Sequence, residues 1–294
     1  MPDSSQGSQA KLSLAAAGTA VGSYTEAYEF ISENLVKAGT ILDTAGIRGT
    51  RSHASERTQA GTYTVQGTIK LHASPAMLDT LLPRILGAAE SSDAFALAET
   101  LPQFDVLIDR VAKRFVYAGC KVDKATFRGQ AGGLIELDLE VIGKTETVTD
   151  TAFPAITAPT DPPYAFQQGV LTLVSSARDF MDFELVIENR LQARFSNSAA
   201  ATDIMPADRE ITLRCRTPFT SGEADLYAQA LLGTAGSLAF TNGGYSTTFA
   251  FGKLQAPDRS PVVAGKSEIP LLLELVARMT STTRELLVTH DSTA

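Results

Sequence analysis

The chain has 294 residues, about twice the usual size of a single domain, and this length predicts two domains. Its 44% hydrophobic and 20% charged content is ordinary for a folded protein and excludes general disorder. The net charge of −8, without a long basic run, excludes a tight nucleic-acid reader, which normally presents clustered Lys or Arg. A negative surface fits plain solubility, and it also fits a surface that nucleic acid passes without adhering; composition does not choose between them.

Cysteine content and hydropathy indicate a reduced protein without a membrane segment. Cys120 and Cys215 each fall in an alternating apolar pattern, which predicts buried thiols rather than a disulfide or a metal pair. The longest apolar run near the N-terminus, residues 14–18, is far too short to span a bilayer and is a poor signal peptide. We therefore expect no membrane segment and a cytoplasmic site of synthesis.

The first 25 residues are predicted to be an arm. Residues 1–22 are rich in Ser, Gln, Ala and Gly without a sustained period, so we expect them to order only against a neighbour. Residues 28–40 follow with a pattern that fits a strand or a helix. They share the order Glu, apolar, apolar, any, Glu, Asn with residues 183–195, where Val and Ile favour a strand.

Residues 41–61 are a long polar segment with most of the local positive charge, in Arg48, Arg51, His53 and Arg57. Segments of this length without structure of their own are uncommon in compact domains. The segment is therefore predicted to be a binding arm or a long hairpin. A solvated hairpin that touches nothing remains the alternative.

Residues 61–87 combine a strand and a helix. Small and apolar side chains alternate strictly with polar ones over residues 63–72, which is the period of a half-buried strand. Ser74 is a candidate cap for a helix that Pro75 opens and Gly87 ends. The apolar stripe of this helix consists of Leu78, Leu81, Leu82 and Ile85.

Further strands are predicted at 104–108, 115–122 and 134–142. The last has apolar side chains on one face, which we expect to pack on the helix, and three carboxylates on the other. Three carboxylates on one strand face are more often a solvated surface than a catalytic group. These residues are Glu136, Asp138 and Glu140.

The second half repeats this order after a Thr- and Pro-rich linker. Residues 209–233 predict another strand and helix, with Thr220 and Glu223 as a capping box and a stripe of Leu226, Tyr227, Ala230 and Leu231. A hairpin turns at Asn242 and Gly243. Residues 265–278 match the strand after Gly133, although Pro270 interrupts their alternation. The order is kept while the spacing shortens, so we predict an internal duplication.

No catalytic, cofactor or metal site is predicted. Gly-Lys-Thr at 143–145 and Gly-Lys-Ser at 265–267 lack the earlier glycine that a phosphate-binding loop requires. The histidines lack a metal ligand or a nucleophile at a suitable spacing and are predicted to lie on the surface. They are His53, His72 and His290. We therefore expect a protein that is not an enzyme.

Taken in order, these segments resemble a known family. GIRGTRSHASER, YTVQGTIKL, SPAMLDTLLPRILG and FVYAGCKVDKATFRGQAGGLIELDLEVIGKTE, with the repeat in the second half, look like the major tail tube proteins of long-tailed, non-contractile bacteriophages, in their duplicated-domain form. The resemblance implies a mainly β fold: a β-sandwich or barrel with one flanking helix per domain, in two tandem copies. The expected units are an N-terminal arm (1–25), domain 1 (26–145), a linker (146–168), domain 2 (169–280) and a C-terminal tail (281–294).

The resemblance also implies a structural virion protein. Six single domains form a ring around a DNA channel in this family, so two domains per chain imply a homotrimeric ring that stacks into a tube. Genomic DNA passes without specific binding, tape-measure and tail-end proteins are implied partners, and assembly is expected in the host cytoplasm. The loop of Arg48, Arg51, His53 and Arg57 is assigned to ring stacking, its arginines meeting acidic groups. The lumen-facing candidates are Glu136, Asp138, Glu140, Glu268 and Glu274.

Two hypotheses of other classes remain open at this point. One is a two-domain β-sandwich binding protein at a phage baseplate or tail tip that contacts a receptor or a sugar. The absence of Trp and the 7% aromatic content weaken the sugar version. The other is an NTPase, suggested by the two Gly-Lys segments, and nucleotide should then raise the melting temperature.

Overall fold

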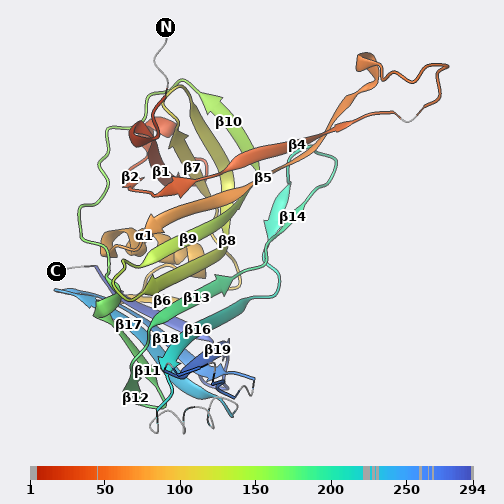
Figure 1. The fold of residues 1–294 in the computed structure, drawn as a ribbon. Helices are drawn as coiled ribbons and strands as arrows, with labels where there is room; N and C mark the ends of the chain where they lie inside the picture. The colour runs from red at the N-terminus through yellow and green to blue at the C-terminus, as the bar shows by residue number, and fades with distance from the viewer. Residues whose placement is uncertain are drawn as a thin grey trace.

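A computed structural model describes residues 5–44, 46–220, 226, 229, 232–257, 260–263, 265–266 and 268–292, and this part of the chain is mainly β (Figure 1). The elements of the first half are β1 (Lys11–Ala16), β2 (Glu26–Tyr28), β3 (Ser32–Glu33), β4 (Val36–Leu42), β5 (Gln59–His72), α1 (Pro75–Leu86), β6 (Ala94–Ala96), β7 (Phe104–Asp109), β8 (Arg114–Gln130), β9 (Glu136–Gly143) and β10 (Thr145–Thr149). Those of the second half are β11 (Gly169–Leu173), β12 (Ser176–Arg178), β13 (Asp182–Glu188), β14 (Gln192–Arg194), β15 (Asp203–Met205), β16 (Glu210–Pro218), β17 (Thr234–Asn242), β18 (Tyr245–Gln255), β19 (Pro270–Arg278) and β20 (Leu286–Asp291).

The strand and helix predicted within residues 61–87 are confirmed as β5 and α1. Pro75 occupies the first turn of α1, and Gly87 ends it with a φ of 99°, a conformation that favours glycine. The predicted cap is wrong in one detail, because the Ser74 side chain makes no capping hydrogen bond. The carboxylate of Asp161 accepts the Ala76 N–H instead, at 2.9 Å, so the segment before β11 caps this helix.

Seven strands from both halves form one continuous antiparallel sheet. Their order is β4, β5, β9, β8, β13, β16 and β19 (Figure 1). The two halves meet at the pairing of β8 with β13, where Lys124 lies opposite Glu188 and Gln130 opposite Asp182. The sheet is therefore not interrupted between the halves.

Strand β8 belongs to two sheets. Its first residues pair with β7 and β10, and its last residues pair with β9 and β13. The register shifts between Val122 and Lys124, and such a bulge bends a strand. In the second half β18 is shared in a similar way: it pairs with β17 as far as Leu254, with β20 as far as Phe251, and with β19 through its last three residues.

The pairing pattern of the first half recurs in the second. In one sheet the order of paired strands β2–β1–β7–β8–β10 corresponds to β12–β11–β17–β18–β20. In the other sheet the order β4–β5–β9–β8 corresponds to β13–β16–β19–β18. Within this pattern β4 and β13 hold the same place, at the outer side of β5 and β16 respectively.

The hydrophobic core runs through both halves without a break. Helix α1 lies against β8 on one side and against β6, β18 and β20 on the other, and its predicted apolar stripe is fully buried. Ring contacts cross the halves, for example Phe127 with Phe249 at 5.0 Å between centroids. Both thiols are buried and unpaired, as predicted, and burial raises the pKa of Cys215 to about 12.

Three segments are more ordered in the structure than their composition indicated. The expected N-terminal arm contains β1, whose Leu12 and Leu14 are buried, and the expected C-terminal tail contains β20, whose Leu286 and Val288 are buried. The expected linker contains β10, and its Tyr164 is buried. Each segment pairs with strands far away in sequence, so its local composition carried no signal of that pairing.

His290 corrects the prediction that all histidines are on the surface, since it is only 2% exposed. Its Nε2 is 3.0 Å from the carbonyl oxygen of Pro75 and its Nδ1 is 2.8 Å from the Thr247 hydroxyl. Burial lowers its pKa. The imidazole thereby joins β20 to the start of α1, which explains why a histidine near the C-terminus is enclosed.

Two expectations about the second half have different outcomes. Pro270 does not interrupt β19, because it is its first residue and the alternation of buried and accessible side chains holds to Arg278. The predicted second helix falls mostly on residues 221–231, of which only Leu226 and Gln229 are among the described residues. Its stripe residues Tyr227, Ala230 and Leu231 and its capping residue Glu223 lie outside them. Within the described ranges, no helix is long and apolar enough to cross a membrane.

Candidate functional site

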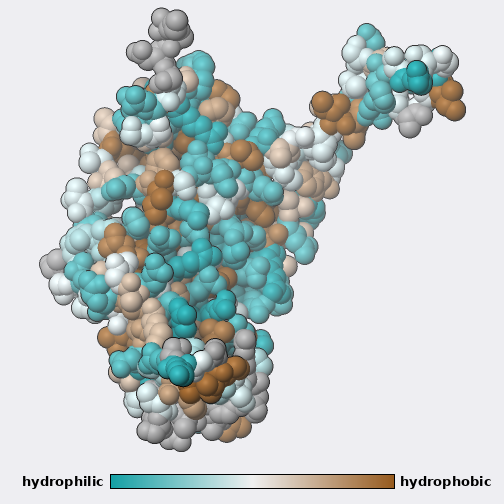
Figure 2. Space-filling view, in the orientation of Figure 1, coloured by the Kyte–Doolittle hydropathy of each residue, from teal (hydrophilic) through white to brown (hydrophobic). Residues whose placement is uncertain are grey.

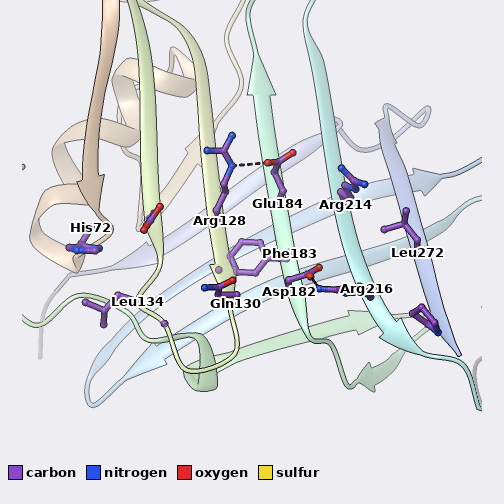
Figure 3. Close-up of a pocket in the computed structure, with 14 residues that line it drawn as sticks. His72, Arg128, Gln130, Leu134, Asp182, Phe183, Glu184, Arg214, Arg216 and Leu272 are labelled. Carbon is purple, nitrogen blue, oxygen red and sulfur yellow. Dashed lines mark hydrogen bonds and ion pairs between the residues drawn. The ribbon is translucent and has the colours of Figure 1, made fainter. Parts of the chain in front are cut away.

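The continuous sheet has one polar face that the rest of the chain leaves accessible. Figure 3 shows part of this face, where the strands from β5 to β19 lie side by side with α1 behind them. Along β13 and β16 every second side chain is buried, and the intervening side chains point to the opposite face. The polar face contains a shallow hollow of about 800 Å³ that spans both halves. Its lining includes His72, Arg128, Glu136, Glu184, Arg214 and Leu272.

A row of alternating bases and acids crosses this face from strand to strand. Lys70 Nζ on β5 is 3.6 Å from Asp138 Oδ2 on β9, and Arg128 Nη1 on β8 is 2.6 Å from the same oxygen. Arg128 Nε is 2.7 Å from Glu184 Oε2 on β13, which joins the two halves (Figure 3). The row ends with Arg214 on β16 and Glu274 on β19, 3.6 Å apart.

We call this row the charge row; it consists of Lys70, Asp138, Arg128, Glu184, Arg214 and Glu274. At its centre, the contact with Glu184 stabilises the charged form of Arg128. The hydrogen bond to Glu184 is the main cause that raises the pKa of the Arg128 guanidinium. Other ion pairs flank the row, including Lys124 with Glu140 and Arg216 with Asp182. The face therefore presents cations that are already paired with carboxylates.

The structure brings most of the proposed lumen residues together. Glu136, Asp138 and Glu140 lie on β9, and Glu274 lies on the same polar face at the far end of the row. Glu268 is exposed but precedes β19 and is not part of a strand. Asp138 is 8% exposed, so it is enclosed by its neighbours and does not form an open acidic surface.

Sequence reasoning missed the basic members of the row. Arg128 lies near the end of β8, and Arg214 alternates with apolar residues in β16. Opposite charges on the polar faces of FELVIEN and EITLRCR are a signal that these strands pair, because cross-strand neighbours of opposite charge stabilise a sheet. The sequence predicted the acidic strand β9 but not the basic residues Lys70 and Arg128 that pair with its Asp138.

The second accessible feature is a projecting hairpin, here called the arm, formed by β4, residues 43–58 and the start of β5. The sequence predicted either a binding arm or a long hairpin. The structure shows a long hairpin that extends away from the body, and binding by it stays a prediction (Figure 1). Among the described residues of its tip, Arg48, Arg51, His53 and Arg57 are exposed. Figure 2 shows hydrophobic side chains on this arm, and among the exposed ones are Ile41, Leu42 and Ile47.

The tip has limited internal structure. The short 3-10 helix η3 (Ser55–Arg57) lies near its end, and His53 contacts the carboxylate of Asp43 across the loop. This hydrogen bond is the main cause that lowers the pKa of Asp43. The three arginines have no carboxylate partner within ion-pair distance among the described residues, so their charge is directed outward.

Comparison with known proteins adds one finding to this geometry. A family model described as phage tail tube protein matches residues 7–274 of the chain, which includes both halves of the continuous sheet and the arm. No curated protein matches the sequence.

Proposed function

The chain belongs to the phage tail tube protein family, and from that membership we propose that three copies form a ring and that rings stack into the tube. Members of this family are structural components of the virion tail that assemble with themselves. Our proposal adds the number of copies, the inner surface and the stacking contact. It also includes an internal duplication, and the strand pairings that recur in the two halves support it.

The observation that carries the proposal is the continuous sheet across the β8–β13 junction. One chain already aligns two equivalent four-strand units, so three chains supply the six units of a ring. Among the described strands the sheet is open along β4 and along most of β19, where β18 pairs with only three residues. Closure into a barrel between chains would remove these free edges. A chain whose described strands form no closed barrel on their own could thereby contribute to one in the tube.

We assign the polar face of the sheet to the lumen. The opposite face packs on α1 and the second layer of strands, so only the polar face is available to line a channel. Phosphate binding needs basic groups that can release counterions, and here Lys70, Arg128 and Arg214 are occupied by carboxylates. Such a surface lets DNA pass without adhering, and it needs no catalytic group.

The test of the ring is its stoichiometry. Purified protein, concentrated and imaged by negative stain, is expected to show rings or tubes, and native mass spectrometry of a single ring is expected to give three chains. A chain that stays monomeric at high concentration with no rings or tubes contradicts the proposal. A discrete soluble oligomer that never stacks would instead support the binding-protein hypothesis.

The arm is proposed as the contact between rings. Reversing its charge with Arg48→Glu, Arg51→Glu and Arg57→Glu should leave single rings and shorten or abolish tubes. The matched control reverses three exposed basic residues outside the arm, Lys113, Arg194 and Arg284. Tubes of unchanged length from the arm variant would remove the arm from stacking.

A further inference from the structure

The outer edge of β4 is open along its whole length. All seven residues of the strand are exposed, and no described strand other than β5 pairs with it. The Tyr63 N–H donates to the Ala199 carbonyl, away from β4, while Tyr63 lies opposite Gly39 in the register. In an antiparallel pair this places the N–H and C=O of Gly39, and of Lys37 two residues earlier, on the open side.

The equivalent edge in the second half is covered. β13 alternates between buried and half-buried residues because one of its faces packs on the core. Its outer side is covered by β8, which pairs with it over seven residues, from Asp182 to Glu188. An ion pair between Arg128 and Glu184 adds to this pairing on the polar face. The chain therefore contains one complete example of how such an edge is filled.

The far end of the sheet lacks the strand that this example requires. In the first half β8 lies along β9 from Glu136 to Ile142, whereas in the second half β18 pairs with only Val276, Ala277 and Arg278 of β19. The rest of the outer edge of β19 has no strand partner within the described part of the chain. Beyond β18, residues 260–263 follow without regular structure, and Val262 and Val263 are 71% and 68% exposed.

We propose that β4 of one copy pairs antiparallel with the β18–β19 end of a second copy, through residues 260–263, in the way that β13 pairs with β8 inside the chain. The inference rests on the proposed ring and specifies its lateral contact. Exposed apolar side chains are present on both surfaces: Val36, Ile41 and Leu42 on β4, and Val262 and Val263 on the other. The contact is head-to-tail, so its repetition is compatible with the proposed ring and does not produce a two-fold dimer.

The charge row agrees with this direction. It begins with a base, Lys70, next to the β4 end and finishes with an acid, Glu274, at the β19 end. A head-to-tail arrangement brings these opposite charges toward each other, and a head-to-head arrangement would bring like charges together.

The first test removes one hydrogen-bond donor from the open edge. Lys37→Pro deletes the outward N–H, and proline is tolerated where an edge N–H faces solvent. Lys37→Ala is the matched control, because it also loses the ammonium that lies 4.2 Å from the Tyr63 ring centre but keeps the N–H. We expect Lys37→Pro to need at least about tenfold more protein to form rings than Lys37→Ala, measured by sedimentation velocity. Equal assembly of the two variants contradicts the proposal.

A cross-linking test does not depend on the fold of the proline variant. Ala38→Cys and Val262→Cys are made as separate full-length proteins, mixed, and treated with a bis-maleimide of about 10 Å, which tolerates a slip of two or three residues. The native Cys120 and Cys215 are buried and do not compete. Covalent dimers are expected at least about tenfold above either variant alone, since only the mixture brings unlike surfaces together.

The outcomes separate the two proposals. If the wild-type protein forms no rings or tubes, the proposed function fails and the lateral contact with it. If rings and tubes form but the mixture yields no more cross-linked dimer than the single variants, the lateral contact alone is wrong.

Discussion

Strands β4 and β13 hold the same place in the two halves, and their surroundings differ completely. β13 has Phe183, Leu185 and Ile187 buried, with β8 on its outer side. β4 is exposed at every residue, and its outer side is open among the described strands. The same place in the pairing pattern therefore gives a buried strand where the core and β8 adjoin it, and an exposed strand where only β5 pairs with it among the described strands.

The segments that follow these two strands differ in the same way. After β4 the chain projects as the arm, whereas after β13 residues 189–209 fold back onto the body. Asn189 is 3% exposed, and Ile204 is fully buried with Leu101 and Leu191 around it. The Lys121 ammonium donates to the Ile204 carbonyl at 2.7 Å. One half thus keeps its connection closed, while the other leaves it available for another molecule.

Among the substitutions considered for the two strands, we expect Leu185→Ala to lower the free energy of unfolding most. Leu185 is fully buried at the junction, opposite Phe127 on β8 and Leu213 on β16. Its truncation should lower the free energy of unfolding by about 2–5 kcal/mol, because a cavity opens between packed strands. Urea unfolding followed by circular dichroism measures this loss. A loss below about 1 kcal/mol would show that the junction is loosely packed.

Two asparagines next to β4 and β13 differ in burial, so we expect their substitutions to differ in cost: Asn34 comes before β4, and Asn189 follows β13. Asn189 Nδ2 donates to the carbonyls of Ile85 and Val122, at 3.2 and 3.1 Å, and both bonds are buried. Asn34 is exposed, and its Oδ1 accepts the Thr68 N–H at 2.5 Å. Asn189→Ala should cost about 1–3 kcal/mol, since two buried carbonyls lose a donor, and Asn34→Ala about 0.5–1.5 kcal/mol. Equal losses in urea unfolding would mean that burial does not distinguish the two sites.

These residues also show what the sequence could predict. Alternation located β5, β8, β9 and β16, apolar and β-favouring residues located β7 and β13, and the match to β9 located β19. The Pro75 and Gly87 signals located α1. All of these signals are local properties of the sequence. The family resemblance was confirmed over residues 7–274. The β8–β13 pairing and the role of Arg128 could not be predicted, because they depend on strands more than fifty residues apart meeting in one register. The enclosure of His290 was missed for the same reason, since its partner Pro75 lies in the other half.

His290 gives a third prediction, of a smaller effect at another contact between the halves. Burial lowers its pKa below the ordinary 6.5, against weaker opposing effects of the Pro75 carbonyl and of the carboxylates of Asp79 on α1 and Asp291 on β20. Unfolding therefore takes up a proton, so the stabilisation is present above pH 6.5 and is lost as the pH falls below it. The melting temperature should decline between pH 7 and pH 5.5, and less so in His290→Gln. The same slope in both proteins would assign the decline to other groups; His53, exposed in the arm, serves as a control by substitution.

The smallest effect is expected for Leu42→Ala, which makes in β4 the same substitution as Leu185→Ala in β13. Leu42 is 58% exposed, so in dilute, monomeric protein the loss in unfolding free energy should stay within about 0.5 kcal/mol. The proposed lateral contact makes the effect of Leu42→Ala depend on protein concentration, which is not expected for Leu185→Ala. If the proposed lateral contact covers β4 in the ring, Leu42→Ala should lower the melting temperature relative to wild type by an amount that grows with protein concentration. The measurement is a series of thermal melts across the concentration at which rings assemble. A Leu42→Ala loss that is large in the monomer, or that does not change with concentration, would show that β4 is not the strand that a second copy covers.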